Sequence, residues 1–228
     1  MSGTSGGVRY SPAALSAVPD IPGSLERALV QLRRGGMIIV CDDPDRENEG
    51  DLCMAAQFVT AETIAFMCRE ARGLVCLSLP MERCEELDLP LMVPSNDGCE
   101  ATGFTVSIEA RTGVTTGISA ADRARTIQVA MHRASTPADL IRPGHVFPLR
   151  ARPGGVLERR GQTEAAVDLT KLAGLTPGGV LCEVMNPDGT MARGIELQAF
   201  CQRHELPVVT VDELATHMAA VRPAISAV

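Results

Sequence analysis

Hydrophobic and polar positions near the start of the chain follow first a helical and then a strand-like pattern. Ser24 precedes a segment whose apolar residues recur at a helical spacing on one face, namely Leu25, Ala28, Leu29 and Leu32. This pattern predicts a helix capped by Ser24 and ended by Gly35 and Gly36. Residues 37–40 then form a short, continuous apolar run, which is typical of a buried strand.

The same two patterns continue along the rest of the chain. They predict helices at residues 60–71, 119–132, 164–173 and 196–204, and a last helix capped by Thr210 and Glu213. They predict strands at residues 73–79, 104–109, 180–183 and 207–210. Strands mixed with helices of this length, without an internal repeat, indicate one layered α/β (α+β) domain over residues 24–228. Residues 1–23 are rich in Gly, Ser and Pro, and we expect a mobile N-terminal tail there.

Composition excludes several classes of protein. The 228 residues carry 21 Lys and Arg against 28 Asp and Glu, a formal net charge of −7, which argues against a general nucleic-acid or anionic-membrane binder. The chain has neither an apolar run of about 18 residues nor a basic-then-apolar leader, so we expect a cytoplasmic protein. Eight cysteines occur without a C-x-x-C pair, and we expect most, including Cys76 and Cys182 in predicted strands, to be packing thiols.

An acidic segment directly follows the first predicted strand. Residues 42–51 hold six carboxylates and Arg46. Glu47, Glu49 and Asp51 alternate, so in an extended chain they project to one side. A hard divalent cation such as Mg²⁺ would relieve their repulsion, and it commonly takes only one or two protein carboxylates. The alternative is a solvated acidic turn.

A basic segment lies farther along the chain. Residues 142–160 carry five arginines against a single Glu158, together with His145, and run into the helix predicted near Glu164. Arginine forks and a helix N-terminus both suit phosphate, and a partly buried His145 suits proton transfer. The alternatives are surface arginines paired with the excess acids and a structural histidine. Together the two segments suggest a phosphorylated, oxygen-rich small substrate.

Five ordered blocks of the sequence carry a family resemblance. They are DRENEGD (45–51), GFTVSIE (103–109), GVTTGISAADR (113–123), RPGHVFPLR (142–150) and GVLCEVMNPDG (179–189). In these blocks, and from about Ser24 to the last helix, the chain resembles the 3,4-dihydroxy-2-butanone-4-phosphate synthases of riboflavin biosynthesis, in their stand-alone form.

The resemblance implies a lyase that converts D-ribulose 5-phosphate to 3,4-dihydroxy-2-butanone 4-phosphate and formate with Mg²⁺ or Mn²⁺. It also implies a mixed sheet flanked by helices and a homodimer with active sites at the subunit interface. The resemblance also implies roles for individual residues. Glu47 and Gln162 match the metal-ligand positions, and His145, Glu183 and Glu49 match the proton-transfer positions. The residues that match substrate-binding positions are Arg46, Glu47, Asp51, Arg159, Arg160, Gly161 and Thr163.

At position 162 the sequence differs from the pattern that the resemblance implies for the family. After the arginine the family has Gly-His-Thr-Glu, whereas this chain has Gln162 between Gly161 and Thr163. An amide offers one carbonyl oxygen, which a hard cation accepts, but it is a weaker ligand than imidazole for most transition metals. Two alternatives therefore stay open beside the synthase. One is a diverged paralogue that acts on a related sugar phosphate, and the other is a catalytically silent binding protein.

Overall fold

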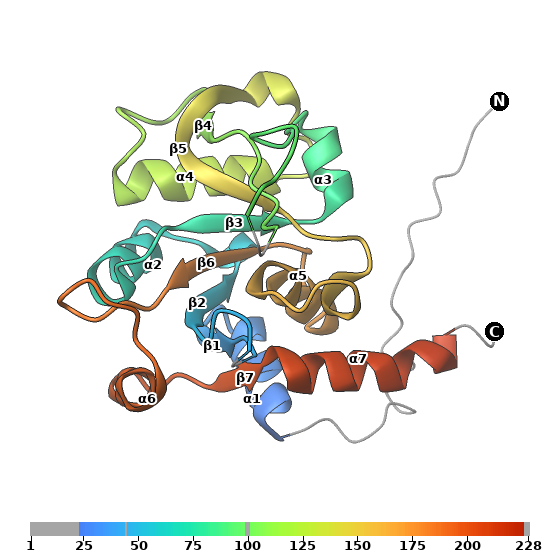
Figure 1. Cartoon of the computed structure of the whole chain (residues 1–228). Coiled ribbons are helices and arrows are strands. Elements are labelled where there is room, and N and C mark those ends of the chain that lie inside the picture. The colour runs from blue at the N-terminus through green and yellow to red at the C-terminus, as the bar shows by residue number, and fades with distance from the viewer. Residues whose placement is uncertain (1–22, 44, 99–100, 226–228) are drawn as a thin grey trace.

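The computed structural model describes residues 23–43, 45–98 and 101–225, so the expected tail lies, except for Gly23, outside the described residues. The described chain forms a seven-stranded mixed sheet of order β4-β5-β3-β6-β2-β1-β7, which runs through the centre of the molecule in Figure 1. The β1–β7 and β3–β5 pairs are parallel and the other pairs are antiparallel. The strands are β1 Ile38–Cys41, β2 Gly50–Ala55, β3 Cys76–Leu79, β4 Ile108–Ala110, β5 Leu140–Arg150, β6 Gly179–Glu183 and β7 Val208–Thr210. The predicted α/β class with a mixed sheet is confirmed.

Helices cover both faces of this sheet. The α-helices are α1 Gly23–Arg33, α2 Ala61–Phe66, α3 Met81–Glu86, α4 Ala120–Met131, α5 Gln162–Leu172, α6 Gly194–Arg203 and α7 Val211–Ile225. A π-helical turn, Met67–Ala71, extends α2, and single 3₁₀ turns lie at Ala56–Phe58, Pro137–Asp139 and Gly155–Leu157.

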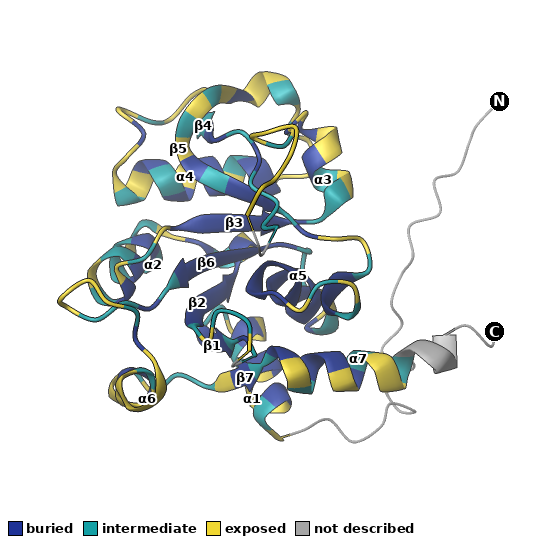
Figure 2. Ribbon diagram, viewed as in Figure 1, coloured by how far each residue is buried: buried dark blue, intermediate teal, exposed yellow. Residues whose placement is uncertain are grey.

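Alternation along the central strands divides the core into two layers. Ile38 and Val40 of β1 join the layer packed by α1, α5 and α7, whereas Ile39 between them joins the layer packed by α2 and α4. In β2, Cys53 joins the layer packed by α1, α5 and α7, and Leu52 joins the layer packed by α2 and α4. Because successive strand residues point to opposite faces, two apolar layers require strands that are apolar throughout. Figure 2 shows the central strands as buried.

Most predicted elements are present. The helices predicted from 60, 119, 164, 196 and 210 and the strands predicted near 37, 73, 180 and 207 are confirmed, with boundaries shifted by a few residues. Thr210 and Glu213 form the expected reciprocal cap of α7. Ser24 as a helix cap is wrong, because α1 already begins at Gly23 and the Ser24 hydroxyl donates instead to Glu213 at 2.7 Å.

Three elements were not predicted, and one is shorter than expected. The strands β2 and β5 and the helix α3 had no counterpart in the sequence patterns. The strand expected at 104–109 is regular only from Ile108, and its first part makes isolated bridges from Phe104 and Thr105. Within the described ranges, the cysteines form no disulfide, and no helix is long and apolar enough to cross a membrane.

Two neighbouring residues of α1 test the layered core. Leu29 is buried and Val30 is exposed. We expect Leu29→Ala to lower the free energy of unfolding by about 2–5 kcal/mol, because it leaves a cavity between α1 and the sheet. Val30→Ala, the matched control, should change it by less than about 1 kcal/mol. Urea denaturation followed by circular dichroism measures both, and equal losses would contradict the packing described here.

Candidate active site

A charged cavity of about 150 Å³ lies where β2 begins and β6 ends. Its walls combine an acidic turn, the start of α5 and the central strands. The lining residues are Arg46, Glu47, Glu49, Asp51, Cys76, Thr102, Phe104, Leu149, Arg159, Gln162, Thr163, Leu181 and Glu183. The cavity therefore brings together the predicted acidic residues with Arg159, Gln162 and Thr163 from the basic side. Cys76, expected only to pack, is buried but forms part of the wall.

The buried carboxylate of Asp42 shapes the acidic turn. One of its oxygens accepts the backbone N–H of Glu47 at 3.0 Å, and the other accepts that of Glu49 at 2.8 Å. Side-chain acceptors of this kind replace backbone partners in tight turns. Asn48, between the two donors, has a φ of 53°, a left-handed conformation that asparagine tolerates. The turn thus presents Glu47 and Glu49 to the cavity.

Three side-chain oxygens converge on one nitrogen of Arg46. Its Nη1 donates to Asp42 Oδ2 at 2.9 Å, to Glu47 Oε2 at 2.9 Å and to Gln162 Oε1 at 2.7 Å. The Arg46 side chain is only 13% exposed, so these charge-assisted bonds lie largely out of water. A positive group at this point joins the acidic turn to the first residue of α5.

Two carboxylates face each other across neighbouring strands. Asp51 of β2 is the register partner of Glu183, the last residue of β6. Burial, and secondly the charge of Glu183, raises the pKa of Asp51 well above its usual range. Glu183 also accepts the backbone N–H of Leu74 at 2.7 Å, which holds its carboxylate in place. Like charges opposed in this way are costly to the fold, so a pair of them lining a cavity points to a chemical role.

The opposite wall is built around the start of α5. Arg159 donates to Glu164 at 2.6 Å and to the hydroxyl of Thr102 at 2.8 Å, so its guanidinium is fixed beside the helix. Thr163 lies in the first turn of α5 and is buried. The first N–H groups of a helix have no partner within the helix and attract anions. This wall suits a phosphate group.

Arg193 holds the acidic turn from outside and was not identified from the sequence. It donates to the carbonyl oxygens of Asn48 at 3.0 Å and Glu47 at 3.2 Å, and to the carboxylate of Glu49 at 2.8 Å. Burial raises the pKa of Glu49, and Arg193 opposes that shift. No motif marks Arg193, because its partners lie far away in the sequence.

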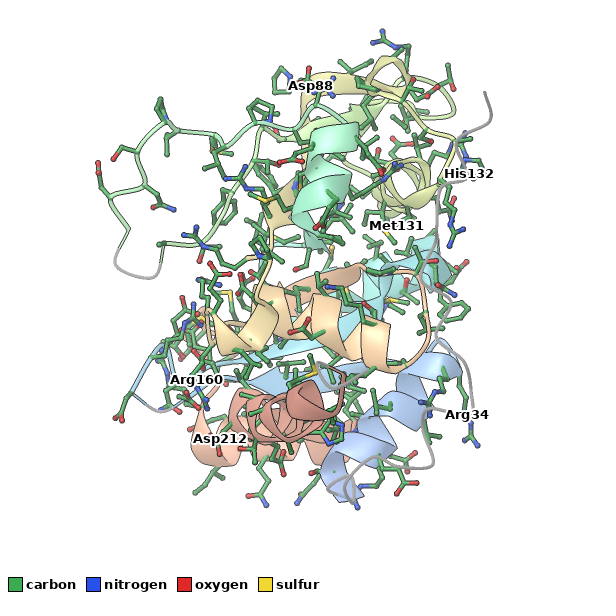
Figure 3. All side chains as sticks on the ribbon, turned by 90° about the vertical axis from the view of Figure 1, so that its right-hand side faces the viewer. Arg34, Asp88, Met131, His132, Arg160 and Asp212 are labelled. Atoms are coloured by element: carbon green, nitrogen blue, oxygen red, sulfur yellow. The ribbon has the colours of Figure 1, made fainter. Side chains whose placement is uncertain are left out.

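The predicted residues Arg160, Gly161 and His145 do not line the cavity. Arg160 bonds Asp43 at 2.8 Å and Asp212 at 2.6 Å, and its place beside Asp212 is visible in Figure 3. His145 lies on β5 four residues before Leu149, which at the usual strand rise is roughly 13 Å from it. Its Nδ1 lies 2.7 Å from Glu109 Oε2, and its side chain is 45% exposed.

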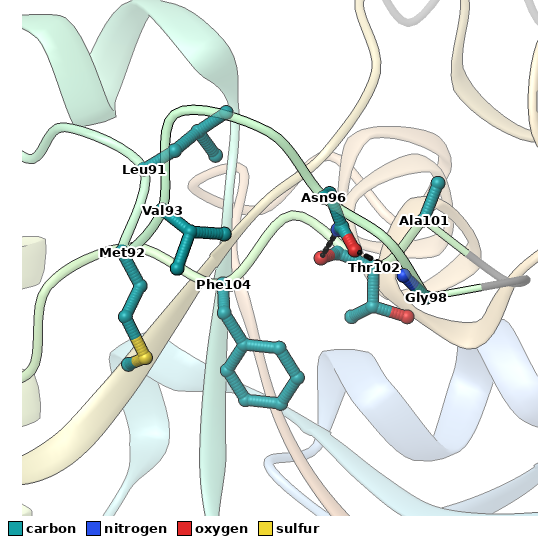
Figure 4. A pocket seen from close by; sticks show the side chains of 8 residues that line it. All are labelled: Leu91, Met92, Val93, Asn96, Gly98, Ala101, Thr102 and Phe104. Carbon is teal, nitrogen blue, oxygen red and sulfur yellow. Dashed lines mark hydrogen bonds between the residues drawn. The ribbon is translucent and has the colours of Figure 1, made fainter.

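A second, larger cavity of about 340 Å³ adjoins the charged one (Figure 4). It is mainly apolar, with Leu91, Met92 and Val93 among its lining residues, and it shares Thr102 and Phe104 with the first cavity. None of its described lining residues carries a titratable side chain. Because acid–base and phosphate chemistry require charged groups, the smaller cavity is the candidate active site.

The donors in the charged cavity fit a hard cation better than a transition metal. No group of three or more His, Cys, Asp or Glu side chains arranged for a metal occurs among the described residues. Glu47 Oε2 and Gln162 Oε1, however, already converge on the positive Arg46 nitrogen. Mg²⁺ typically takes one or two protein oxygens and keeps water and substrate oxygens as its other ligands, so this pair fits it.

Comparisons with known proteins agree on one family. The model of the family described as 3,4-dihydroxy-2-butanone 4-phosphate synthase matches residues 26–217. The chain is 58% identical over 193 residues to the 3,4-dihydroxy-2-butanone 4-phosphate synthase of Nitratidesulfovibrio vulgaris strain DP4, covering 85% of this chain and 90% of that protein. It is also 58% identical over 193 residues to the riboflavin biosynthesis protein RibBA of Aquifex aeolicus, covering 84% of this chain and 48% of that protein.

Solved structures give the same result. A 3,4-dihydroxy-2-butanone 4-phosphate synthase in complex with two magnesium ions superposes with a TM-score of 0.82 at 42% identity, over 85% of this chain and 95% of that one. The two-domain RibBX of A. baumannii superposes with a TM-score of 0.80 at 51% identity, over 83% of this chain and 56% of that one. The chain therefore spans about half the length of some relatives and nearly all of others.

The opposed carboxylates predict a pH dependence of stability. The pKa of Asp51 is higher in the folded protein than in the unfolded chain. The free energy of unfolding therefore falls as the pH rises from the ordinary Asp pKa through the raised pKa of the folded state. We expect Asp51→Asn, without added metal, to raise the free energy of unfolding at neutral pH and to flatten its decline with pH.

Asp122 provides the matched control, because hydrogen bonds led by the Thr115 hydroxyl lower its pKa. Its contribution is present above the ordinary Asp pKa and is lost as the pH falls through the lowered value. Asp122→Asn should therefore destabilise the protein at neutral pH. Urea unfolding between pH 4 and 8 measures both variants, and a destabilised Asp51→Asn variant would refute the account of Asp51.

Removing Arg193 should loosen the acidic turn locally. In Arg193→Ala we expect the amides of Glu47 and Glu49 to exchange with deuterium about fivefold faster or more, the effect of roughly 1 kcal/mol of lost local stability. Hydrogen exchange with mass spectrometry measures this effect. Arg33→Ala removes an exposed arginine that bonds the carbonyl oxygens of Leu172 and Ala173 elsewhere, and it should leave exchange in the turn unchanged. Unchanged exchange in Arg193→Ala would contradict the bracing role.

Proposed function

Because this chain belongs to the 3,4-dihydroxy-2-butanone 4-phosphate synthase family, we propose that it is a riboflavin-biosynthesis lyase that converts D-ribulose 5-phosphate to 3,4-dihydroxy-2-butanone 4-phosphate and formate. One observation carries the proposal beyond family membership. A single cavity contains the carboxylates of Glu49, Asp51 and Glu183 at one side and Arg159 with Thr163 at the other. A phosphorylated ketose needs both kinds of group.

The phosphate of the substrate would be bound at the start of α5. Arg159 supplies fixed N–H donors, and the first turn of α5 adds backbone N–H groups beside the Thr163 hydroxyl. Gly161, the residue before this helix, leaves room for that guanidinium, because an added Cβ would clash with Arg159 Nη1. Holding the phosphate fixes where the reacting carbons lie against the carboxylates.

Proton transfer would be the work of the carboxylates. Removing a proton from a carbon next to the ketone requires a base, and returning protons along the carbon chain requires an acid. Asp51 with a raised pKa retains its proton at a higher pH than an ordinary aspartate, and the raised pKa of Glu49 makes it a stronger base when ionised. Glu183, directly opposite Asp51, completes the set.

Glu47 and Gln162 would hold the divalent cation, Mg²⁺ or Mn²⁺, through their side-chain oxygens. When bound, such a cation supplies positive charge that stabilises negative charge developing on the substrate oxygens. Arg46 adds a positive group beside the same oxygens, and Asp42 accepts a hydrogen bond from the same guanidinium nitrogen.

His145 would act in the site of a second copy of the chain. It is too far along β5 to reach the cavity of its own subunit, yet it is exposed and oriented by Glu109. Two large, exposed apolar residues lie near this pair. Ile141, 40% exposed, is the register partner of Glu109, and Ile118, 55% exposed, follows Gly117, whose added Cβ would clash with the Glu109 carboxylate. An exposed apolar patch of this kind favours association, which supports a homodimer with shared active sites. A cytoplasmic location stays a prediction.

Formate release tests the proposal. We expect purified protein with ribulose 5-phosphate and Mg²⁺ to release formate, and Glu47→Gln and His145→Ala each to lose about 100-fold or more in kcat. If the site is shared, mixing these two variants under subunit exchange should restore up to about a quarter of the wild-type activity, because half of the dimers then contain one intact site.

Other outcomes distinguish the alternatives. No formate at any Mg²⁺ concentration would refute the synthase. Deuterium exchange into the sugar phosphate without formate would indicate a diverged enzyme that stops at enolisation, and absence of both would indicate a binding protein. Lack of restored activity in the mixture, with each variant folded and dimeric, would reject the shared site while leaving the lyase intact.

A further inference from the structure

The charged cavity is unusual in the kind of donor atom that it offers to a metal. Its described lining includes four carboxylates, the Gln162 amide and two threonine hydroxyls, but no histidine. The nitrogens of Arg46 and Arg159 are protonated at any physiological pH and cannot coordinate a metal. Apart from one sulfur atom, every lining side-chain atom able to ligate a cation is an oxygen.

That sulfur belongs to Cys76, which is buried in the cavity wall. Burial, and then the nearby charges of Glu183 and Asp51, raises the pKa of the Cys76 thiol far above the physiological range. The thiolate, not the thiol, is the metal ligand. Before a metal binds, the only soft donor of the cavity is thus a protonated thiol, and the donors that need not lose a proton from sulfur are oxygens.

The position of Gln162 gives its oxygen a defined role. Gln162 is the first residue of α5 and is buried, so helix and packing fix its side chain. Its Oε1 lies 2.7 Å from the Arg46 nitrogen that Glu47 Oε2 also contacts at 2.9 Å. A neutral amide oxygen and a carboxylate oxygen thus point to the same positively charged position.

We propose that Gln162 determines which cation this site prefers. Its amide oxygen, paired with Glu47, gives an all-oxygen ligand set that favours Mg²⁺ relative to metals such as Ni²⁺ that bind imidazole strongly. This inference rests on the proposed function in one respect only, namely that Glu47 and Gln162 are the residues that hold the cation.

Metal titrations of the intact protein test the inference without using activity. Binding of Mn²⁺ is followed by electron paramagnetic resonance of the free ion, and Mg²⁺ and Ni²⁺ are measured as competitors. The proteins are the wild type, Gln162→His, Gln162→Met and Gln57→His. The last variant is the matched control, because it adds an imidazole at an exposed glutamine outside the cavity.

We expect Gln162→His to increase the affinity for Ni²⁺ relative to Mg²⁺ by about tenfold or more, since imidazole replaces an amide. Gln162→Met, which removes the oxygen with little change in volume, should weaken Mg²⁺ binding about tenfold or more, the usual range for a lost metal-site contact. Gln57→His should leave both affinities at the cavity unchanged. Circular dichroism and thermal melting confirm that each variant is folded.

The inference is overturned if Gln162→Met binds Mg²⁺ as tightly as the wild type, or if Gln162→His leaves the ratio of Ni²⁺ to Mg²⁺ affinity unchanged. Formate release by the same preparations separates this result from the proposed function. The expected change of preference without formate would support the metal role of Gln162 while refuting the lyase. Formate release with unchanged metal preference would do the reverse.

Discussion

The site depends on the register between β2 and β6, which sets Asp51 opposite Glu183. Two carboxylates in direct opposition, one of them buried, repel each other, so the side chains themselves do not explain this pairing. The apolar residues that follow explain it, because Leu52 and Cys182 belong to one core layer while Cys53 and Leu181 belong to the other. A slip of one residue would exchange the two layers and bring unlike packing surfaces together. The core thus holds the acids together against their repulsion.

The fold could be predicted where one pattern dominates. A helical period identified α1, and a short apolar run identified β1. The strand β2 was not predicted, because it follows a dense acidic run and is buried on both faces. Its sequence therefore shows no alternation of apolar and polar residues. The strand β5 contains Pro143 and Pro148 and several charges, which sequence rules place outside regular sheets. Its pairing with β3 and β4 is a tertiary effect that local composition does not carry.

The sequence predicted the chemical groups of the site better than the contacts that position them. The acidic segment and the basic segment were identified by charge, and residues from both line one cavity. Sequence order did not reveal that Arg193 braces the acidic turn, since the two lie 144 residues apart. Nor did it show that His145, close in sequence to Arg159, lies on the outer part of the sheet. Such links arise only when distant elements pack.

Pairing of β1 with β7 has a consequence for how the chain is made. The first strand of the sheet receives its outer partner only from Val208–Thr210, and Ser24 of α1 meets Glu213 of α7, 189 residues later. A nascent chain emerging from the ribosome therefore carries β1 with one edge unpaired for most of its synthesis. Unpaired edges invite pairing with other chains. The edge of β1 is therefore closed only after Val208–Thr210 has been synthesised.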